Sequence, residues 1–359
     1  MKCHTSSMFT LGCLLVFSGP VLAQEPGSVG VGESAPATPV SEAPAPEPDT
    51  SPEETSAPAK ETTTSKPDAE PQAQEEDTEA ATAWQPPQHR LLYRNRLVAR
   101  LNPSGLQNGF ELAYHYRLFD SDSVLFRDSY VGVAVKPMIS PAFTRIGISA
   151  QAQPLAVLYL EASWNWMMWY GVLGHPRTYP DATGDYSDTG VSDAAEALGE
   201  PNAASGWELD LIAELRAKVG PLVIRNRFTM MRSELSSAEP VSDSLFYDPL
   251  YDLLRPRSGW SLMNDADVLV YLLDEHLIIG ARHTMAMALW PGEMGSETTH
   301  RLGPLVAYRF FMEPGATFDA PTAFTLVQWH LDHPHRTGQD VSQAIPYIVL
   351  GFAFQGDLL

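Results

Sequence analysis

The sequence predicts an all-β chain, in which an up-and-down antiparallel barrel of about twelve strands, within a range of about ten to fourteen, follows a disordered N-terminal segment. Three observations lead to this prediction. Polar and apolar residues alternate with a period of two through most of residues 86–359. The alternating segments are longer than the strands of ordinary soluble sheets. Short and long connections fall mainly on opposite sides of the sheet.

Residues 1–23 have the features of a secretory signal peptide. Lys2 precedes an apolar stretch, and a small-residue pattern ends at Ala23, as signal cleavage requires. Cys3 and Cys13 both lie inside this segment. The exported chain is therefore expected to have no disulfide and no thiolate metal site.

Residues 24–85 are predicted to be disordered. They consist mainly of Pro, Ala, Glu, Ser and Thr, which bury too little apolar surface to offset the entropy of folding. Residues 24–83 hold 14 acidic residues against Lys60 and Lys66, a net charge of −12. We expect the segment either to be a solvating periplasmic spacer or to tether the folded part to a periplasmic partner.

The alternating segments after residue 88 are predicted to be strands with one dry and one wet face. In the stretch GFELAYHYRLF, the residues Phe110, Leu112 and Tyr114 share one face, while Glu111 and His115 share the other. Most segments exceed the length of about 9 to 11 residues with which a tilted strand crosses a bilayer. The predicted strands are 89–102, 108–119, 128–137, 142–153, 155–168, 207–219, 221–232, 259–272, 276–290, 299–312, 322–332 and 344–355.

The connections between these strands are sorted by length, although imperfectly. Turns such as Pro154 and Gly220 lie on one side of the predicted sheet, and the two longest loops, Trp169–Gly206 and Ser233–Ser258, share the other side. A soluble β-sandwich has no reason to sort its loops in this way. A barrel that crosses a bilayer has short turns at one rim and long loops at the other.

Aromatic residues mark both ends of the predicted strands. Trp164, Trp166 and Trp260 lie near the long-loop rim, and Phe352 and Phe354 lie near the opposite rim, as amphipathic rings do at two membrane interfaces. With these girdles, a secretory signal, no later cysteine and a last strand PYIVLGFAF, the chain resembles the Gram-negative outer-membrane β-barrel class. The resemblance implies a place among outer-membrane lipids and a last strand that ends on an aromatic residue. Here five residues follow Phe354.

If the apolar faces meet lipid, the polar faces line the lumen. The tripeptide Arg-Asn-Arg occurs at 94–96 and at 225–227, on two strands expected to lie opposite one another, which a duplicated six-strand unit would explain. The arginines of the first strand need partners across the lumen, in an inserted segment or in a solute, because a buried unpaired charge is too costly. The acids Glu208, Asp210 and Glu214 are expected to form cross-strand pairs with Arg225 and Arg227. The expected lumen-lining residues are Arg90, Arg94, Arg96, Arg100, Glu111, His115, Arg117, Glu161, Glu208, Asp210, Glu214, Arg225, Arg227, Asp265 and Asp267.

These features leave three functions open. A narrow, porin-like channel is the first, because opposed positive and negative walls favour small polar or anionic solutes. The second is a plugged barrel that serves a structural role or contacts a partner through its long loops. A membrane-embedded lipid hydrolase is disfavoured, because the outward-facing His283 and the neighbouring Asn264 have no serine nearby. We therefore expect no catalytic residue and no enzymatic activity.

The stretch WHLDHPHR is the best candidate for a metal site. His330, Asp332, His333 and His335 lie within six residues at the rim of the last long loop, and such ligands suit Zn²⁺ or Cu²⁺. The simpler interpretation is a polar rim loop that binds a divalent metal incidentally, so no cofactor is expected. The net charge of −21 and the absence of a phosphate-binding loop argue against a nucleic-acid partner.

Overall fold

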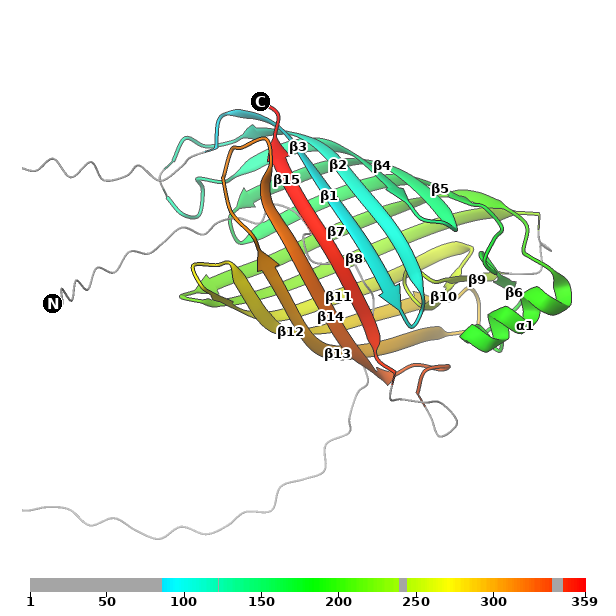
Figure 1. Cartoon of the computed structure of the whole chain (residues 1–359). Coiled ribbons are helices and arrows are strands. Elements are labelled where there is room, and N and C mark those ends of the chain that lie inside the picture. The colour runs from blue at the N-terminus through cyan, green and yellow to red at the C-terminus, as the bar shows by residue number, and fades with distance from the viewer. Residues whose placement is uncertain (1–85, 122, 239–243, 338–344) are drawn as a thin grey trace, which may run out of the picture. The chain divides into compact units, whose positions relative to one another are not determined.

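The computed structural model shows twelve long strands closed into one antiparallel barrel (Figure 1). Each barrel strand pairs with the barrel strands before and after it along the chain, and the last closes the ring against the first. The predicted fold is confirmed. The barrel strands are β1 (His89–Leu101), β2 (Gly105–Arg117), β3 (Tyr130–Ile139), β4 (Phe143–Leu155), β5 (Leu158–Trp169), β7 (Ala204–Val219), β8 (Leu222–Ser237), β11 (Ser258–Leu272), β12 (Leu277–Leu289), β13 (Ser296–Arg309), β14 (Asp319–Asp332) and β15 (Tyr347–Asp357).

The structure describes part of the chain. The predicted signal peptide and the predicted disordered acidic segment lie outside the described residues, and both stay predictions. The described residues are 86–121, 123–238, 244–337 and 345–359.

Most strand ends differ from the predicted ends by only a few residues, with two informative exceptions. β8 continues to Ser237, beyond the predicted end at residue 232, because it pairs with the extended start of β7 at Ala204. β15 extends to Asp357, which lies opposite Leu92 of β1. The last strand therefore continues past Phe354 instead of ending on an aromatic residue.

The barrel is apolar outside and polar inside. The outward side chains of Ile148 and Trp166 are 62% and 68% exposed. The inward side chains of Glu208, Asp265 and Arg282 are fully buried, at 0%. This inverted arrangement suits a wall whose outer surface contacts lipid, because strands of membrane barrels alternate apolar residues outward with polar residues inward.

One side of the interior is filled by apolar side chains. Leu305, Leu326 and Val349 from β13, β14 and β15 form a single buried cluster with Val98 of β1 and Leu269 of β11. A barrel of twelve strands lies between the eight-stranded kind, which its side chains fill, and the open barrels of sixteen or more strands. The cluster narrows the lumen without excluding charge from these strands, because Arg100 of β1, Asp267 of β11 and Arg301 of β13 are also buried there.

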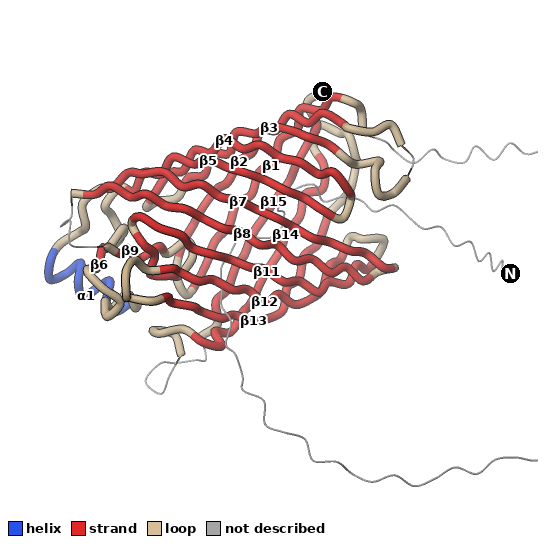
Figure 2. Tube along the Cα trace, turned by 180° about the vertical axis from the view of Figure 1, so that it is seen from behind, coloured by secondary structure: helices blue, strands red, loops and turns tan. Residues whose placement is uncertain are grey.

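Both long loops contain secondary structure that the sequence did not predict. The loop between β5 and β7 forms β6 (Thr178–Tyr179) and the helix α1 (Asp188–Leu198). The loop between β8 and β11 forms β9 (Leu245–Asp248) and β10 (Leu253–Pro256), and β10, β9 and β6 make a small three-stranded sheet. Figure 2 shows α1 and β6 at the end of the barrel opposite the C-terminus. Among the described residues, no helix has the length and apolar character that crossing a membrane requires.

Ile148 on β4 allows a test of the lipid-facing wall. Because an arginine at the middle of this face costs about 2–4 kcal/mol, we expect Ile148→Arg to lower the free energy of unfolding from lipid vesicles by that amount. The matched change Leu198→Arg lies on α1, where the side chain is 79% exposed, and should cost less than about 0.5 kcal/mol. Urea titrations followed by tryptophan fluorescence measure both values. Equal effects would contradict the assigned orientation.

Candidate functional site in the barrel lumen

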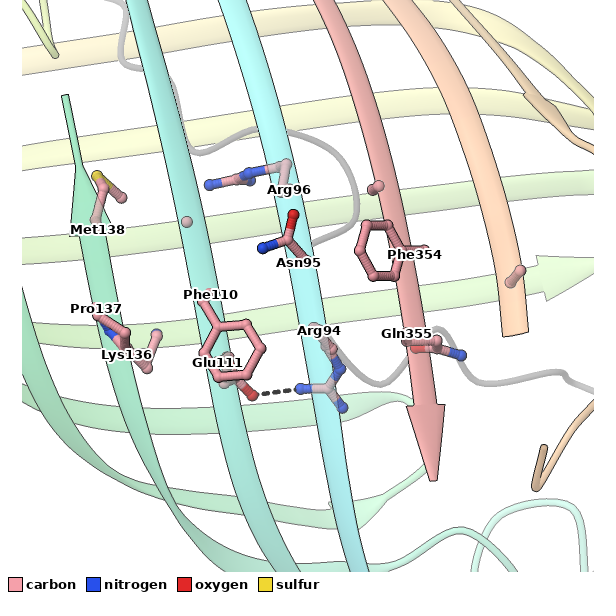
Figure 3. A pocket seen from close by; sticks show the side chains of 13 residues that line it. Arg94, Asn95, Arg96, Phe110, Glu111, Lys136, Pro137, Met138, Phe354 and Gln355 are labelled. Carbon is pink, nitrogen blue, oxygen red and sulfur yellow. Dashed lines mark hydrogen bonds and ion pairs between the residues drawn. The ribbon is translucent and has the colours of Figure 1, made fainter. Parts of the chain in front are cut away.

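The arginine row of β1 is satisfied mainly by neighbouring strands. Arg90 donates to both carboxylate oxygens of Asp357 on β15, at 3.1 and 2.7 Å. Arg94 donates to Glu111 on β2 at 2.5 Å (Figure 3). The sequence prediction had no acid for Arg90, because it ended the last strand at residue 355. Arg90 and Arg94 therefore need no acid from the opposite wall of the barrel.

His115 and Arg117 continue the polar face of β2 toward the short-turn rim. The His115 ring donates a hydrogen bond from Nε2 to the side-chain oxygen of Gln151 at 3.0 Å and stacks on Tyr130 with 3.8 Å between ring centroids. Arg117 donates to Asp120 at 3.0 Å. Neither residue reaches a charge on the opposite wall in these contacts.

A connected row of charges joins β7, β8, β11 and β12. Arg227 donates to Glu214 at 3.2 Å. Arg225 donates to Asp267 through Nε at 2.7 Å, and Arg282 donates to the other oxygen of Asp267, also at 2.7 Å. Each arginine therefore has an acid on an adjacent strand, so the pairs hold neighbouring strands in register.

The two remaining predicted acids of this region are also engaged. Asp265 lies 3.6 Å from the Arg282 guanidinium and accepts a hydrogen bond from Thr284 at 2.8 Å. Glu161 on β5 pairs with Lys136 of β3 and accepts a hydrogen bond from Tyr159. Lys136 was not among the residues expected in the lumen.

Glu208 and Asp210 have different partners from those that the sequence suggested. The β7–β8 register places Ser233 opposite Glu208, so Arg225 and Arg227 lie too far along β8 to reach it. Arg145 of β4 instead contacts Glu208 at 2.7 Å and Asp210 at 3.1 Å. Arg255 of β10 contacts Glu208 at 2.5 Å. One of the two partners thus comes from a loop.

That loop is folded into the long-loop mouth of the barrel. We call residues 245–256, which comprise β9, β10 and their turn, the plug hairpin, and every one of these residues is buried. Phe246, Leu250 and Leu253 belong to one apolar cluster with inward side chains of the wall, including Phe143 and Met231. The apolar side chains of the hairpin are covered by the barrel. The hairpin is thus part of the barrel interior, while contact of the long loops with a partner stays a prediction.

Two arginines tie the plug hairpin to the wall. Arg255 bridges Glu208 of β7 and Asp248 of the hairpin, with a distance of 2.8 Å to Asp248. Arg100 of β1 donates Nη1 to the carbonyl oxygens of Pro249 and Leu250, at 3.0 and 3.2 Å. The inserted segment that the β1 arginines were expected to need is therefore present for Arg100.

Arg336, in the loop after β14, binds the plug hairpin at the long-loop rim. It donates to Asp252 of the hairpin at 2.6 and 3.0 Å, and to Asp188 of α1 at 3.1 Å through two nitrogens. It also donates to the Asn102 side chain, in the turn between β1 and β2, at 2.5 Å. Tyr247 adds a hydrogen bond to Asp252 at 2.8 Å. A single guanidinium thus joins four segments at the long-loop rim.

A small cavity of about 80 Å³ lies beside β1, and charged side chains line it together with apolar ones such as Phe110 and Met138. Arg94, Arg96 and Lys136 border it together with Glu111 (Figure 3). A Cβ placed on Gly109 would meet no atom within 4 Å. The cavity therefore exists partly because position 109 has no side chain.

The histidine-rich stretch does not form the rim metal site that its spacing suggested. His333 contacts Asp252 at 3.4 Å, and His335 contacts Asp185 at 3.5 Å. His330 packs against the His333 ring, while Asp332 is exposed. Within the described residues, no three His, Cys, Asp or Glu side chains converge on a common point.

The outward-facing His283 has a different neighbour from the one expected. Its Nε2 lies 3.3 Å from Nδ1 of His300 on β13. Asn264 makes a reciprocal pair of hydrogen bonds with Asn226 on β8, at 2.9 and 3.0 Å. The His–Asn arrangement considered for a lipid hydrolase is therefore replaced by two separate polar pairs.

The residues that sequence reasoning missed are Lys136, Arg145, Arg282, Asp248, Asp252, Arg255 and Arg336. Most of them belong to loops, so the period of two gives no information about their direction. The available signal was the composition of the segment LFYDPLYDLLRP. It carries more large apolar side chains than an exposed loop needs, which indicates that something covers it.

The closed wall, its apolar outer surface and its charged interior define an outer-membrane β-barrel. Within lipid, only helices and closed barrels satisfy every backbone hydrogen bond. The class follows from the fold itself. In this class the long loops face the cell exterior and the short turns face the periplasm.

Comparison with known proteins adds no narrower family. No protein-family model and no curated protein matches the chain. Similar solved structures include CdiB from Acinetobacter baumannii, at 9% identity and a TM-score of 0.36 over 76% of this chain and 60% of that chain. The translocator domain of the autotransporter NalP from Neisseria meningitidis has 9% identity and a TM-score of 0.32, over 74% of this chain and 87% of that chain. OprD from Pseudomonas aeruginosa has 9% identity and a TM-score of 0.26, over 76% of this chain and 95% of that chain.

These likenesses concern the barrel architecture alone. The chain spans about 60% of the CdiB chain that it matches. Sequence identity of 9% in all three comparisons carries no information on solutes or partners.

The Asp252–Arg336 pair predicts how pH acts on the plug hairpin. Burial alone would raise the pKa of the Asp252 carboxyl, but Arg336 and then His333 hold it well below its usual value. The pair therefore contributes fully above the unfolded pKa of about 3.9, and its contribution is lost as pH falls through the lower folded value. Breaking one partner of a buried pair costs about 3–5 kcal/mol. We expect Asp252→Asn to speed hydrogen exchange of residues 245–256 accordingly at pH 7.

The difference between wild type and Asp252→Asn should shrink as the pH is lowered from about 4 toward 2. Hydrogen exchange measured by mass spectrometry, corrected for intrinsic rates, gives the comparison. Asp181→Asn is the matched control, because Asp181 is exposed and bonds only to Thr183 in the contacts found. Equal protection of residues 245–256 in wild type and Asp252→Asn at pH 7 would show that the Asp252–Arg336 pair does not hold the plug hairpin.

Proposed function

We propose that the protein is a narrow channel of the bacterial outer membrane for small polar or anionic solutes, and that it rests closed with the plug hairpin as its gate. The observation that carries the proposal is the place of the hairpin, a separate segment seated in the mouth of a charged lumen. The proposal includes export through a cleavable signal peptide. It involves no enzymatic step.

The charges of the hairpin support a gate that can move. Arg255 of the hairpin forms an ion pair with Glu208 of the wall, and Asp252 forms one with Arg336 of the loop after β14. Ion pairs lose desolvation cost when they separate into water, which offsets much of the lost attraction. An apolar plug without such pairs would have no comparable compensation for leaving the mouth.

The lumen below the hairpin favours anions. Arg94, Arg96 and Lys136 border the cavity of about 80 Å³, where Arg94 pairs with Glu111 and Lys136 pairs with Glu161 of β5. Cationic side chains in a narrow, low-dielectric passage raise the local concentration of anions. The cavity is too small to conduct by itself, so passage requires the side chains and the hairpin to move.

A permanently plugged barrel with a surface role is the second candidate. It is favoured by the apolar packing of the hairpin, since Leu245, Phe246 and Leu253 are each 0% exposed. In that case the lumen stays shut, and α1 with the neighbouring loops offers the surface for a partner. The partner would then contact the long-loop rim.

Planar-bilayer recording of three proteins separates the two candidates. We expect wild type to be almost silent. Arg336→Gln should open at least about tenfold more often, because loss of a buried partner costs more than the 1.4 kcal/mol that a factor of ten represents. Replacement of residues 245–256 by a short Gly-Ser linker should give steady conductance, and reversal potentials in a KCl gradient should show preference for chloride.

Arg177→Gln is the matched control, because Arg177 lies in the same rim and its side chain donates to Gly199. It should leave the opening frequency unchanged. Folding of each variant is checked by its strand content in circular dichroism. A folded linker variant without conductance would overturn the channel and support the plugged barrel.

A further inference from the structure

A second cavity lies outside the lumen, at the long-loop rim. It has a volume of about 570 Å³, and it is bordered by α1, by the β1–β2 and β3–β4 turns, and by the plug hairpin. This volume falls in the range of about 300–1,000 Å³ that small-molecule sites occupy. The lining is mixed, as in such sites. Its side chains include the apolar residues Leu106, Phe143, Leu173 and Val191 and the polar residues Arg100 and His175.

Arg100 supplies a cation to the wall of this cavity. Its guanidinium is held in place by the hairpin carbonyls through Nη1. A Cβ at the neighbouring Gly105 would lie 2.9 Å from Arg100 Nη2, and both residues border the cavity. The missing side chain at position 105 therefore lets the guanidinium lie along the cavity wall.

The His175 ring borders the same cavity. Its Nδ1 is enclosed by protein atoms and makes no hydrogen bond within the described residues, so this nitrogen does not open into the cavity. The ring is fixed against Tyr247 of the hairpin, with 5.5 Å between ring centroids. Burial lowers the pKa of His175 to about 4, despite the nearby Glu200. The ring is therefore neutral at pH 7 and adds no charge to the cavity wall.

The two acids that border the cavity are already engaged. Asp188 receives two hydrogen bonds from Arg336 at 3.1 Å. Glu200 accepts the backbone N–H of Gly174 at 2.7 Å. Both carboxylates are exposed to water, and Asp188 is also paired with Arg336, so the buried charge on the cavity wall is that of Arg100. The polar end of the cavity suits a negative charge.

We infer that this cavity binds a small organic anion, in which a carboxylate is attached to an apolar body. The carboxylate lies against the Arg100 guanidinium, and the apolar body packs against Leu173 and Val191. Charge-assisted hydrogen bonds from Arg100 provide the preference for the anion. The cavity is bordered by Tyr247 and Pro249 of the seated hairpin, but the inference requires only that the hairpin is seated and not that it opens a channel.

Isothermal titration calorimetry of the full chain in lipid nanodiscs tests the site. Phenylacetate is the probe, and phenylacetamide is its uncharged analogue; titration into empty nanodiscs is subtracted. We expect saturable binding of phenylacetate and at least about tenfold weaker binding of phenylacetamide, which corresponds to the loss of about 1.4 kcal/mol. No saturable binding of phenylacetate, or equal affinity for the two probes, would overturn the inference.

A filled-cavity variant keeps the test independent of the hairpin. Ala195 of α1 borders the cavity, so Ala195→Trp should weaken phenylacetate binding by at least about tenfold. Leu198→Trp is the matched control on the same helix, since Leu198 is 79% exposed and does not border the cavity; it should bind as wild type does. Wild-type affinity in Ala195→Trp would place the anion elsewhere and refute the site.

Discussion

Charge enclosed by a narrow, closed wall is the constraint on which the rest of the structure depends. Lipid offers no hydrogen-bond partner to the backbone, so the sheet must close on itself. Closure with twelve strands leaves a narrow interior, between the eight-stranded kind that its side chains fill and the open barrels of sixteen or more strands. Every inward arginine must then find an acid or a carbonyl within a few ångströms. The pairs Arg94–Glu111 and Arg227–Glu214 meet this requirement between adjacent strands.

Near the long-loop rim, adjacent strands no longer suffice, and the plug hairpin completes the pairing. Glu208 forms an ion pair with Arg255 of the hairpin, and Arg100 donates hydrogen bonds to two hairpin carbonyls. The hairpin in turn needs the wall, because its apolar side chains and Asp252 are buried only when it is seated. Arg336 couples that seat to α1 and to the β1–β2 turn. Closure of the mouth and the shape of the outer cavity thus share one set of contacts, so a ligand of the cavity that contacts Tyr247 would act on the hairpin, and reciprocally.

The barrel was predictable from the sequence and the hairpin was not, for one physical reason. A strand's period of two fixes the side on which each residue lies, so the inward direction of Arg225 and Asp267 follows from their positions alone. The position of a residue along the barrel axis depends on the strand register, which the sequence pattern does not determine. The predicted pairing of Glu208 with Arg225 and Arg227 was wrong for this reason. The direction of a loop depends on tertiary contacts. Nothing local to Asp252 indicates that it meets Arg336, 84 residues away.

The two Arg-Asn-Arg tripeptides make the same two kinds of side-chain pair on opposite walls of the barrel. β1 and β8 lie six strands apart in both directions around the ring. In each, the first arginine lies opposite an acid on the next strand, Glu111 or Asp267. The central asparagines face outward, where an unsatisfied amide would be costly in lipid. Each is bonded to a second asparagine, Asn108 at 3.0 Å or Asn264 at 2.9 Å. The register of the two sets agrees, with the second asparagine three residues before the acid. A repeated six-strand unit explains this agreement more simply than two independent origins do, because both the inward ion pair and the outward amide pair recur together.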